Sequence, residues 1–439
     1  MDIFLGIGLL LLLIVVGVPV GFALGLAGTI SLAMIVSPGI VGSLLGQVVH
    51  HTASNYVLLT IPMFVLMAEF LSASGIAKDM MISCSRLMHR VKGGLAMACV
   101  LAGSILASAS GSSTASVASI SSAAFPTMKS LGYNEGFSIG TLAIAGTLAI
   151  MIPPSIAFIV YGIITEESIG RLFMAGLIPG IVTALGYIVT IAIVVRIRPS
   201  WAPDPKLVKS QILKADSDGE AAGELRQTGR VWPMLVLIFI VLGALYSGIA
   251  TPTEVGAIGA FGALAISLML RRMTWGTFYV AVGKTLRTTA MIVAIIFGAL
   301  LFGYFMAYTN VTTSMIEWIS TAGLSPYTVL LLVVFIYLIL GMFMDQFAII
   351  VLTVPITYAV LTGLGFDGIW LGIVLIKTAE IGLVSPPLGL NIYIASGSTG
   401  VSTKEGFTGV APFLVVEMLI LGLLIAFPSI SLFLPNLLS

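Results

Sequence analysis

The chain has 439 residues, of which 59% are hydrophobic and 8% charged, and its mean hydropathy is +1.15. This composition excludes a water-soluble surface, and continuous apolar runs such as Phe4–Val16 and Met418–Phe427 predict membrane-spanning helices rather than the alternating strands of a barrel. A formal net charge of +1 offers no basic surface, so we expect no nucleic-acid partner.

The first elements along the chain are plain apolar spans followed by a charged stretch. Because Met1-Asp2 leads directly into an apolar run without a basic region, we expect the first helix to be retained rather than cleaved. The segments Phe4–Val36 and Asn55–Ser72 read as framework spans. Charges at helical spacing from Lys78 to Lys92 fit either a solvated loop helix or an amphipathic helix in the membrane interface, and we favour the second.

The segment Ala102–Thr127 is apolar but dense in serine and glycine, and it carries no charge before Pro126. Small polar residues of this kind also occur at ordinary helix interfaces. The distribution of basic residues, however, places both ends of the segment on the same side of the membrane. We therefore expect a re-entrant hairpin whose tip is Ser110-Gly111-Ser112-Ser113.

A double proline breaks an apolar stretch twice, at Ile152-Pro153-Pro154-Ser155 and at Ser385-Pro386-Pro387-Leu388. A shift of 233 positions superposes the two breaks and also aligns Leu131-Gly132 with Leu364-Gly365. The chain is therefore an internal duplication. Proline removes helical N–H donors, and unwound backbone at membrane depth is tolerated only against protein, water or an ion. Paired breaks of this kind indicate a transporter's binding site near the midplane.

The topology follows from the longest polar segment, Arg196–Arg230, which carries seven basic residues and should be cytoplasmic. Each half must then cross the membrane an odd number of times, which makes the two halves antiparallel. We predict an all-α polytopic membrane protein with a first inverted repeat at 1–195, a cytoplasmic linker at 196–231 and a second inverted repeat at 232–439. Both termini should lie on the periplasmic side.

The second half repeats the plan of the first. Trp232–Leu270 and Thr288–Tyr308 read as framework spans, and the basic stretch Thr274–Arg287 is expected to form the second interfacial helix. A second hairpin is expected over Tyr327–Tyr358, with Asp345-Gln346 near its tip. An aspartate in such a run indicates function, because a carboxylate in lipid costs several kcal/mol unless it is paired or bound to an ion.

The chemistry-bearing residues point to ion-driven transport rather than to an enzyme. The sequence has no nucleophile–base pair, metal-ligand cluster or nucleotide-binding loop, and Cys84 and Cys99 read as packing residues. Hydroxyls and unwound carbonyls suit sodium, whereas a proton path needs titratable groups in series, so we favour sodium. Glu69, Glu254, Lys377, Glu380 and Glu417 are the intramembrane candidates for such a path. Lys377 and Glu380, one turn apart, most simply neutralise each other.

The candidate ligands lie at the tips and the breaks. The candidate sodium-binding residues are Ser110, Gly111, Ser112, Ser113, Ile152 and Pro153 in the first half and Asp345, Gln346, Gly382, Ser385 and Pro386 in the second. The candidate substrate-binding residues are Ser104, Ser108, Ser155 and Asn391. Helix N-termini after the breaks, at Ser155 and Leu388, and at the hairpin tips favour an anionic substrate.

The sequence resembles the large membrane subunit of tripartite ATP-independent periplasmic (TRAP) transporters over essentially its whole length. The resemblance is carried by the motifs at Gly111–Ser116, Leu131–Asn134, Ile152–Ile156, Ala175–Gly180 and Ala250–Glu254, together with Asp345, Ser385-Pro386-Pro387 and Arg287-Thr288-Thr289. It implies a bacterial inner-membrane protein that imports an organic acid with sodium ions. It also implies an elevator mechanism, in which the hairpins move against a fixed scaffold, and two partners: a small four-helix membrane subunit and a periplasmic substrate-binding protein.

Two other functions remain open from the residues alone. One is a self-sufficient carrier of organic anions that needs no binding protein, and the other is an ion channel lined by the oxygen-rich breaks. The sequence does not choose among dicarboxylates, sialic acid, keto acids and sulfonates as the substrate.

The linker orientation is testable because it underlies the whole topology. A cysteine placed at Ser217 should react with a membrane-impermeant thiol reagent only from the cytoplasmic side, since the basic residues around it are retained there. Labelling of right-side-out and inverted vesicles measures this. Reaction from the periplasmic side alone would overturn the antiparallel arrangement.

Overall fold

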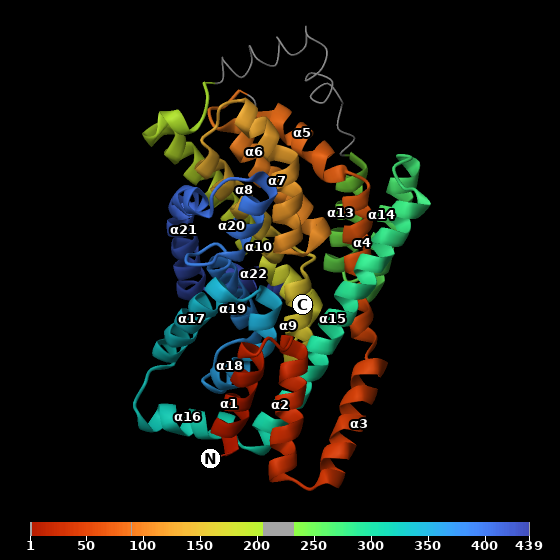
Figure 1. Cartoon of the computed structure of the whole chain (residues 1–439), viewed down its shortest axis with the longest axis vertical. Coiled ribbons are helices and arrows are strands. Elements are labelled where there is room, and N and C mark those ends of the chain that lie inside the picture. The colour runs from red at the N-terminus through yellow and green to blue at the C-terminus, as the bar shows by residue number, and fades with distance from the viewer. Residues whose placement is uncertain (1, 89, 205–231, 439) are drawn as a thin grey trace.

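The computed structural model describes residues 2–88, 90–204 and 232–438, and these residues form a helical bundle without strands (Figure 1). Within them, seven helices are long and apolar enough to cross a membrane. The number rises to eight if the pair α8 and α9, bent by 40° at a break, counts as one span. The multi-pass helical membrane protein expected from the composition is therefore confirmed.

The first half contains a run of framework helices, an α-helical hairpin and a broken span. Its helices are α1 (Asp2–Val15), α2 (Val20–Ile35), α3 (Pro38–Ser54), η1 (Tyr56–Leu59), α4 (Thr60–Ala73), α5 (Ile76–Met88), α6 (Gly94–Ser110), α7 (Ser113–Ser130), α8 (Glu135–Met151), α9 (Ile156–Thr165), α10 (Ile169–Ile197) and η2 (Pro199–Trp201). Side-chain caps fix several of these boundaries. Asn134 accepts from the Phe137 N–H before α8, and Ser168 accepts from the Arg171 N–H before α10.

The second half has the same order with one fusion. Its helices are α13 (Trp232–Tyr246), α14 (Pro252–Met269), α15 (Trp275–Tyr308), α16 (Val311–Thr321), α17 (Pro326–Phe343), α18 (Gln346–Gly363), α19 (Gly368–Gly382), α20 (Leu390–Thr399), α21 (Thr403–Ala426) and α22 (Ser429–Leu438). Thr251 and Glu254 form a reciprocal capping box at the start of α14. Asp367 caps α19 at the position that corresponds to Asn134.

The helix boundaries repeat at the spacing of the double prolines. The 233-residue shift carries α7 onto α18 end to end and α8 onto α19 with the same first residue. Gly132 and Gly365, which precede these two spans at corresponding positions, both have positive φ, at 82° and 95°. In Figure 1, α5 lies near the upper end of the molecule and its counterpart α16 near the lower end.

One expected element is placed differently. Thr274–Arg287 is not a separate interfacial helix, because Trp275–Tyr308 forms one continuous helix of 34 residues. In the first half, Asn55 and Pro62 separate α3 from α4, and proline near a helix start cannot continue the preceding helix. The position equivalent to Pro62 is Ile295, which has no such effect. The counterpart of α5 is instead α16.

The helices form two groups. One group, α1 to α4 with α13 to α15, packs through small residues, for example Gly28 against the backbone of Leu301 and Phe302. The other contains the two helix pairs α6–α7 and α17–α18, the two broken spans, and α10, α21 and α22. Helix α5 connects the groups along the chain and packs on α6 and α7. Residues 205–231, most of the expected linker, lie outside the described residues.

Helices α17 and α19 approach each other most closely at two glycines. A Cβ added to Gly341 would lie 2.7 Å from the Cα of Gly382 and 2.9 Å from the carbonyl oxygen of Ala379. Both obstacles are backbone atoms, which cannot move aside as a flexible side chain would. Gly382 was expected to be a sodium ligand, and in the structure its close contact with Gly341 holds the hairpin helix α17 against the broken span.

Replacing Gly341 with alanine should therefore destabilise the protein by about 1–3 kcal/mol, since the added methyl forces the two backbones apart. Thermal unfolding in detergent measures the loss. Gly397→Ala is the matched control, because Gly397 also lies in a helix but its Cβ would meet nothing within 4 Å. An unchanged midpoint for Gly341→Ala would contradict the close-packing interpretation.

Candidate functional site

The tip of the first hairpin is a two-residue turn rich in hydroxyl groups. Helix α6 ends at Ser110, Gly111 follows with φ of +56°, and Ser112 is the N-cap of α7. Glycine suits this turn because a left-handed conformation carries no steric cost without a Cβ. The Ser112 hydroxyl lies 3.2 Å from the Thr114 hydroxyl. The turn presents several oxygen atoms together with the N-terminus of α7.

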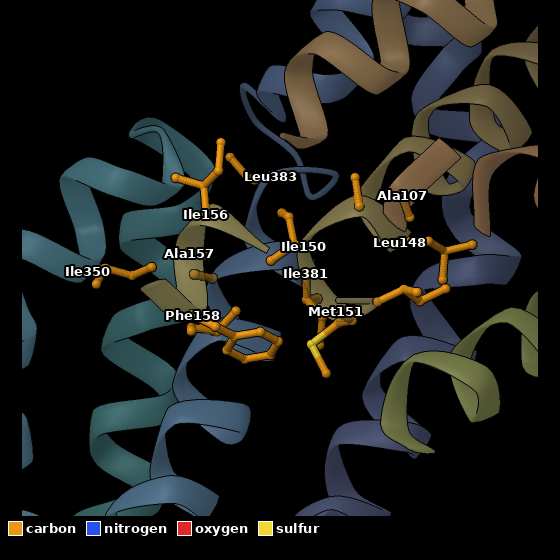
Figure 2. Packing of buried hydrophobic residues seen from close by; sticks show 14 of the residues in the cluster. Ala107, Leu148, Ile150, Met151, Ile156, Ala157, Phe158, Ile350, Ile381 and Leu383 are labelled. Carbon is orange, nitrogen blue, oxygen red and sulfur yellow. The ribbon is translucent and has the colours of Figure 1, made fainter. Parts of the chain in front are cut away.

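This tip lies directly against the first break. A Cβ on Gly111 would lie 3.2 Å from both the carbonyl oxygen of Pro154 and the backbone nitrogen of Ile156. The break is fully covered, and Figure 2 shows Ile150, Met151, Ile156 and Phe158 packed in the apolar cluster around it. The sequence placed the Ser110–Ser113 tip and the break in one site, and the structure brings them together.

A residue of the second repeat completes this region. Asn391, in the first turn of α20, donates from Nδ2 to the Ser113 hydroxyl oxygen at 2.5 Å, and its side chain is fully buried. Among the described residues, its Oδ1 atom has no hydrogen-bond partner, and neither does the buried hydroxyl of Ser155, the N-cap of α9. Buried polar atoms are normally paired, so unpaired ones beside two helix N-termini favour a ligand site.

The second hairpin tip and its break have a different geometry. Asp345 is exposed and caps α18, since its Oδ1 accepts from the N–H groups of Phe347 (2.9 Å) and Ala348 (3.2 Å). The break begins with a turn in which the buried Ser385 hydroxyl donates to the Ile381 carbonyl at 2.7 Å. Pro386 is exposed, whereas Ile152–Ser155 are buried. Both double prolines contain a cis peptide bond, Pro153-Pro154 and Pro386-Pro387.

The remaining candidate residues have separate places. Ser104 is half-buried, and its hydroxyl donates to the Val100 carbonyl within α6. Gln346 is buried, and its Nε2 has no hydrogen-bond partner in the part of the chain that the structure describes. The side chains of Ser108 and Ser110 lie outside the described residues. Helix α20 begins at Leu390 with Gly389 as its N-cap, two residues later than the expected start at Leu388.

A cavity of about 130 Å³ separates the first hairpin from the framework helices. On the hairpin side it is lined by Ser112, Ser116 and Ser119, which share one face of α7, and on the opposite side by Glu69 of α4 and Thr288 of α15. The sequence analysis did not single out Ser116 and Ser119. Their spacing from Ser112, four and seven residues, is the signal of a common helix face that could have found them.

The expected intramembrane charges have partners within the described residues. Glu254 belongs to the capping box at the start of α14 and is exposed. Glu69 lies 3.6 Å from the ammonium of Lys284. Lys377 pairs with Glu380, as expected, at 3.4 Å. Its closer partner is Glu417, at 2.6 Å, and the spacing of residues in the sequence could not reveal this second pair.

Solved structures share this fold. The YdaH transporter of Alcanivorax borkumensis matches with a TM-score of 0.64 at 15% identity, covering 88% of each chain. MtrF of Neisseria gonorrhoeae, whose structure is described as illuminating a class of antimetabolite efflux pumps, matches with a TM-score of 0.56 at 15% identity, covering 86% of this chain and 83% of that one. The chain thus shares the fold of these two polytopic helical proteins.

The chain belongs to the family described as the tripartite ATP-independent periplasmic transporter, DctM component, whose model matches residues 7–430. It is 36% identical to the C4-dicarboxylate TRAP transporter large permease protein DctM of Pseudomonas aeruginosa, over 94% of both chains. It is 32% identical to the isethionate TRAP transporter permease protein DctMQ of Oleidesulfovibrio alaskensis, over 97% of this chain and 65% of that one. It is 27% identical to the sialic acid TRAP transporter large permease protein SiaM of Vibrio cholerae, over 97% and 96%.

The bond between Asn391 and Ser113 can be tested by a double-mutant cycle. Ser113→Ala leaves a buried amide donor without its acceptor, which should destabilise the protein by about 1–3 kcal/mol. Adding Asn391→Leu removes the donor, so the double variant should lose less than the sum of the single losses. Unfolding midpoints measure all three. Ser122→Ala, an exposed position on the same helix, is the control, and strictly additive losses would contradict the bond.

Proposed function

We propose that this protein is the large permease of a sodium-coupled importer of a small organic anion. The observation that carries the proposal is the meeting of the first hairpin tip, the first break and Asn391 at one buried, oxygen-rich place. The family membership supports transport, and the chemistry of these groups supports the choice of ion and substrate.

The cation proposal rests on ligand type. Sodium is a hard cation that several neutral oxygens can hold, and a broken span supplies carbonyl oxygens that a helix would otherwise use internally. We place the first sodium site among Ser110–Ser113 and the carbonyls of Ile152 and Pro153. The second lies at the corresponding place in the other repeat, among Asp345, Gln346, Ser385 and Pro386.

The substrate proposal rests on donors. The N-termini of α9 and α20 direct backbone N–H groups and positive dipole ends towards the region of Ser155 and Asn391, which favours a carboxylate or sulfonate. Three relatives are named for a C4-dicarboxylate, isethionate and sialic acid, all of them organic acids. We extend that class, and no single member of it, to this chain.

The movement proposal follows from the two groups of helices. The hairpins and broken spans would move together as a transport unit against the framework group, with the cavity beside Ser112 at the boundary between them. The first break is covered while Pro386 in the second is exposed, which fits a protein that opens its two sides in alternation.

The assembly proposal follows from the family. We expect a small four-helix membrane subunit on the framework helices, a periplasmic binding protein that delivers the substrate, and a bacterial inner membrane in which the linker faces the cytoplasm. We place the subunit on the framework because this group would stay fixed while the hairpins and broken spans move.

Reconstitution tests the function. Vesicles containing both membrane subunits should accumulate the substrate only when sodium is present outside and the loaded binding protein is added. Vesicles with an inactive binding protein are the control. Uptake by this chain alone would instead establish a self-sufficient carrier, and a conductance that does not saturate would establish a channel.

Two variants of Asp345 distinguish a role in helix capping from a role in ion binding. Asparagine is as good an N-cap as aspartate, so Asp345→Asn should keep the unfolding midpoint, whereas Asp345→Ala should lose about 0.5–2 kcal/mol of stability. If the carboxylate also binds sodium, both variants should need more sodium for half-maximal uptake. A normal sodium dependence of Asp345→Asn would restrict Asp345 to capping.

A further inference from the structure

A buried polar network joins the two broken spans through side chains that are not among the candidate ion and substrate residues. Lys377 and Glu380 lie on α19, Glu417 on α21, Tyr187 on α10 and Thr147 on α8. All five side chains are at most 1% exposed. Two of the four helices come from each repeat, so the network crosses the junction of the halves.

The contacts form a connected chain. The ammonium of Lys377 lies 2.6 Å from Glu417 Oε2 and 3.4 Å from Glu380 Oε2. The Tyr187 hydroxyl donates to Glu417 Oε1. The Thr147 hydroxyl lies 3.2 Å from the Tyr187 hydroxyl and donates to the Ile144 carbonyl at 2.7 Å. Lys377 is the centre of the network because both carboxylates contact it.

The network lies at corresponding positions of the two repeats but is not symmetric. The 233-residue shift pairs Thr147 with Glu380, so equivalent turns of the two broken spans both take part. The positions equivalent to Lys377 and Glu417 are Ile144 and Ala184, which are apolar. The fold therefore accommodates apolar residues at these two positions, and the second repeat carries a charged group at each of them.

Tight packing alone does not account for these charges. Desolvation of a buried ion pair offsets much of its attraction, and apolar replacements of similar volume are often equally stable. What a hydrogen-bonded ionic network adds is geometry, because it fixes the rotation and height of one helix against another. Here it fixes α19 against α10 and α21, with Thr147 of α8 at the end of the network.

The network lies close in sequence to both breaks. Glu380 is two residues before the end of α19 at Gly382, and Thr147 is four residues before the end of α8 at Met151. A small displacement of α19 therefore moves the carbonyl and hydroxyl oxygens that follow it. Cation affinity depends steeply on such positions, since each ligand must lie within a few tenths of an ångström of its place.

We propose that Lys377 and its partners Glu417, Glu380 and Tyr187 are positioning residues that set the register of the two broken spans and thereby the sodium affinity, without contacting sodium or substrate. This inference rests on the proposed function, in which the breaks bind sodium.

The test compares stability with sodium dependence in the assembled transporter. The triple variant Lys377→Met, Glu380→Gln, Glu417→Gln removes every charge and keeps the side-chain shapes. It should unfold close to the parent midpoint, because no carboxylate is left without its counter-ion. The sodium concentration for half-maximal uptake should rise by about three- to tenfold, the size of change that altered coupling between sites produces. Tyr187→Phe, which removes one hydroxyl, should give a smaller shift in the same direction.

A second measurement and a control make the outcome decisive. Amide hydrogen exchange over residues 383–391 should be faster in the triple variant if the register of the break is lost. Ser267→Ala removes a buried hydroxyl that donates to Phe70 and Ala263 in the framework helices, and it should change neither exchange at the break nor sodium dependence.

The results separate this inference from the proposed function. Unchanged sodium dependence and unchanged exchange in the triple variant would overturn the positioning role, even if its stability falls. If the triple variant does not fold, Tyr187→Phe decides by the same two readouts. If the parent imports substrate without sodium, the proposed coupling fails, and exchange over 383–391 alone then decides whether the network holds the break.

Discussion

Every backbone N–H and C=O group at membrane depth needs a partner, and this constraint governs the arrangement of the chain. A double proline cannot satisfy it within its own helix, so each break must lie against other protein segments or water. At the first break this enclosure is provided by the tip of α6–α7 and by apolar side chains of neighbouring helices. The hairpin tip and the first break therefore depend on each other for their packing.

Much of the fold could be predicted because the same motifs occur in both halves of the sequence. The double prolines, the glycines before the broken spans and the hydroxyl-rich tip are local signals whose meaning depends on backbone chemistry rather than on distant partners. The same locality explains the error over Thr274–Arg287. Its basic residues resemble an interfacial helix, but whether it joins the next span depends on the absence of a proline at Ile295, which a charge pattern does not report.

The candidate site was harder to predict because its residues come from segments that are far apart in the sequence. The contact of Asn391 with Ser113 joins residues 278 positions apart, and the pairing of Lys377 with Glu417 joins different helices. Helical spacing could pair Lys377 only with Glu380. Ser116 and Ser119 were accessible from their spacing, whereas Glu69 and Thr288 face them only because two separate helices close the cavity. Residue chemistry thus identified the type of site, and tertiary packing determined its members.

The hydrogen bond from Asn391 to Ser113 also bears on how such a chain can arise. It links the hairpin of one repeat to the broken span of the other, so neither repeat alone contains the complete buried region. A half-length ancestor would have needed a second copy to assemble the same buried region. Joining the copies into one chain freed the two halves to diverge, as the change from Phe158 to Asn391 at equivalent positions illustrates.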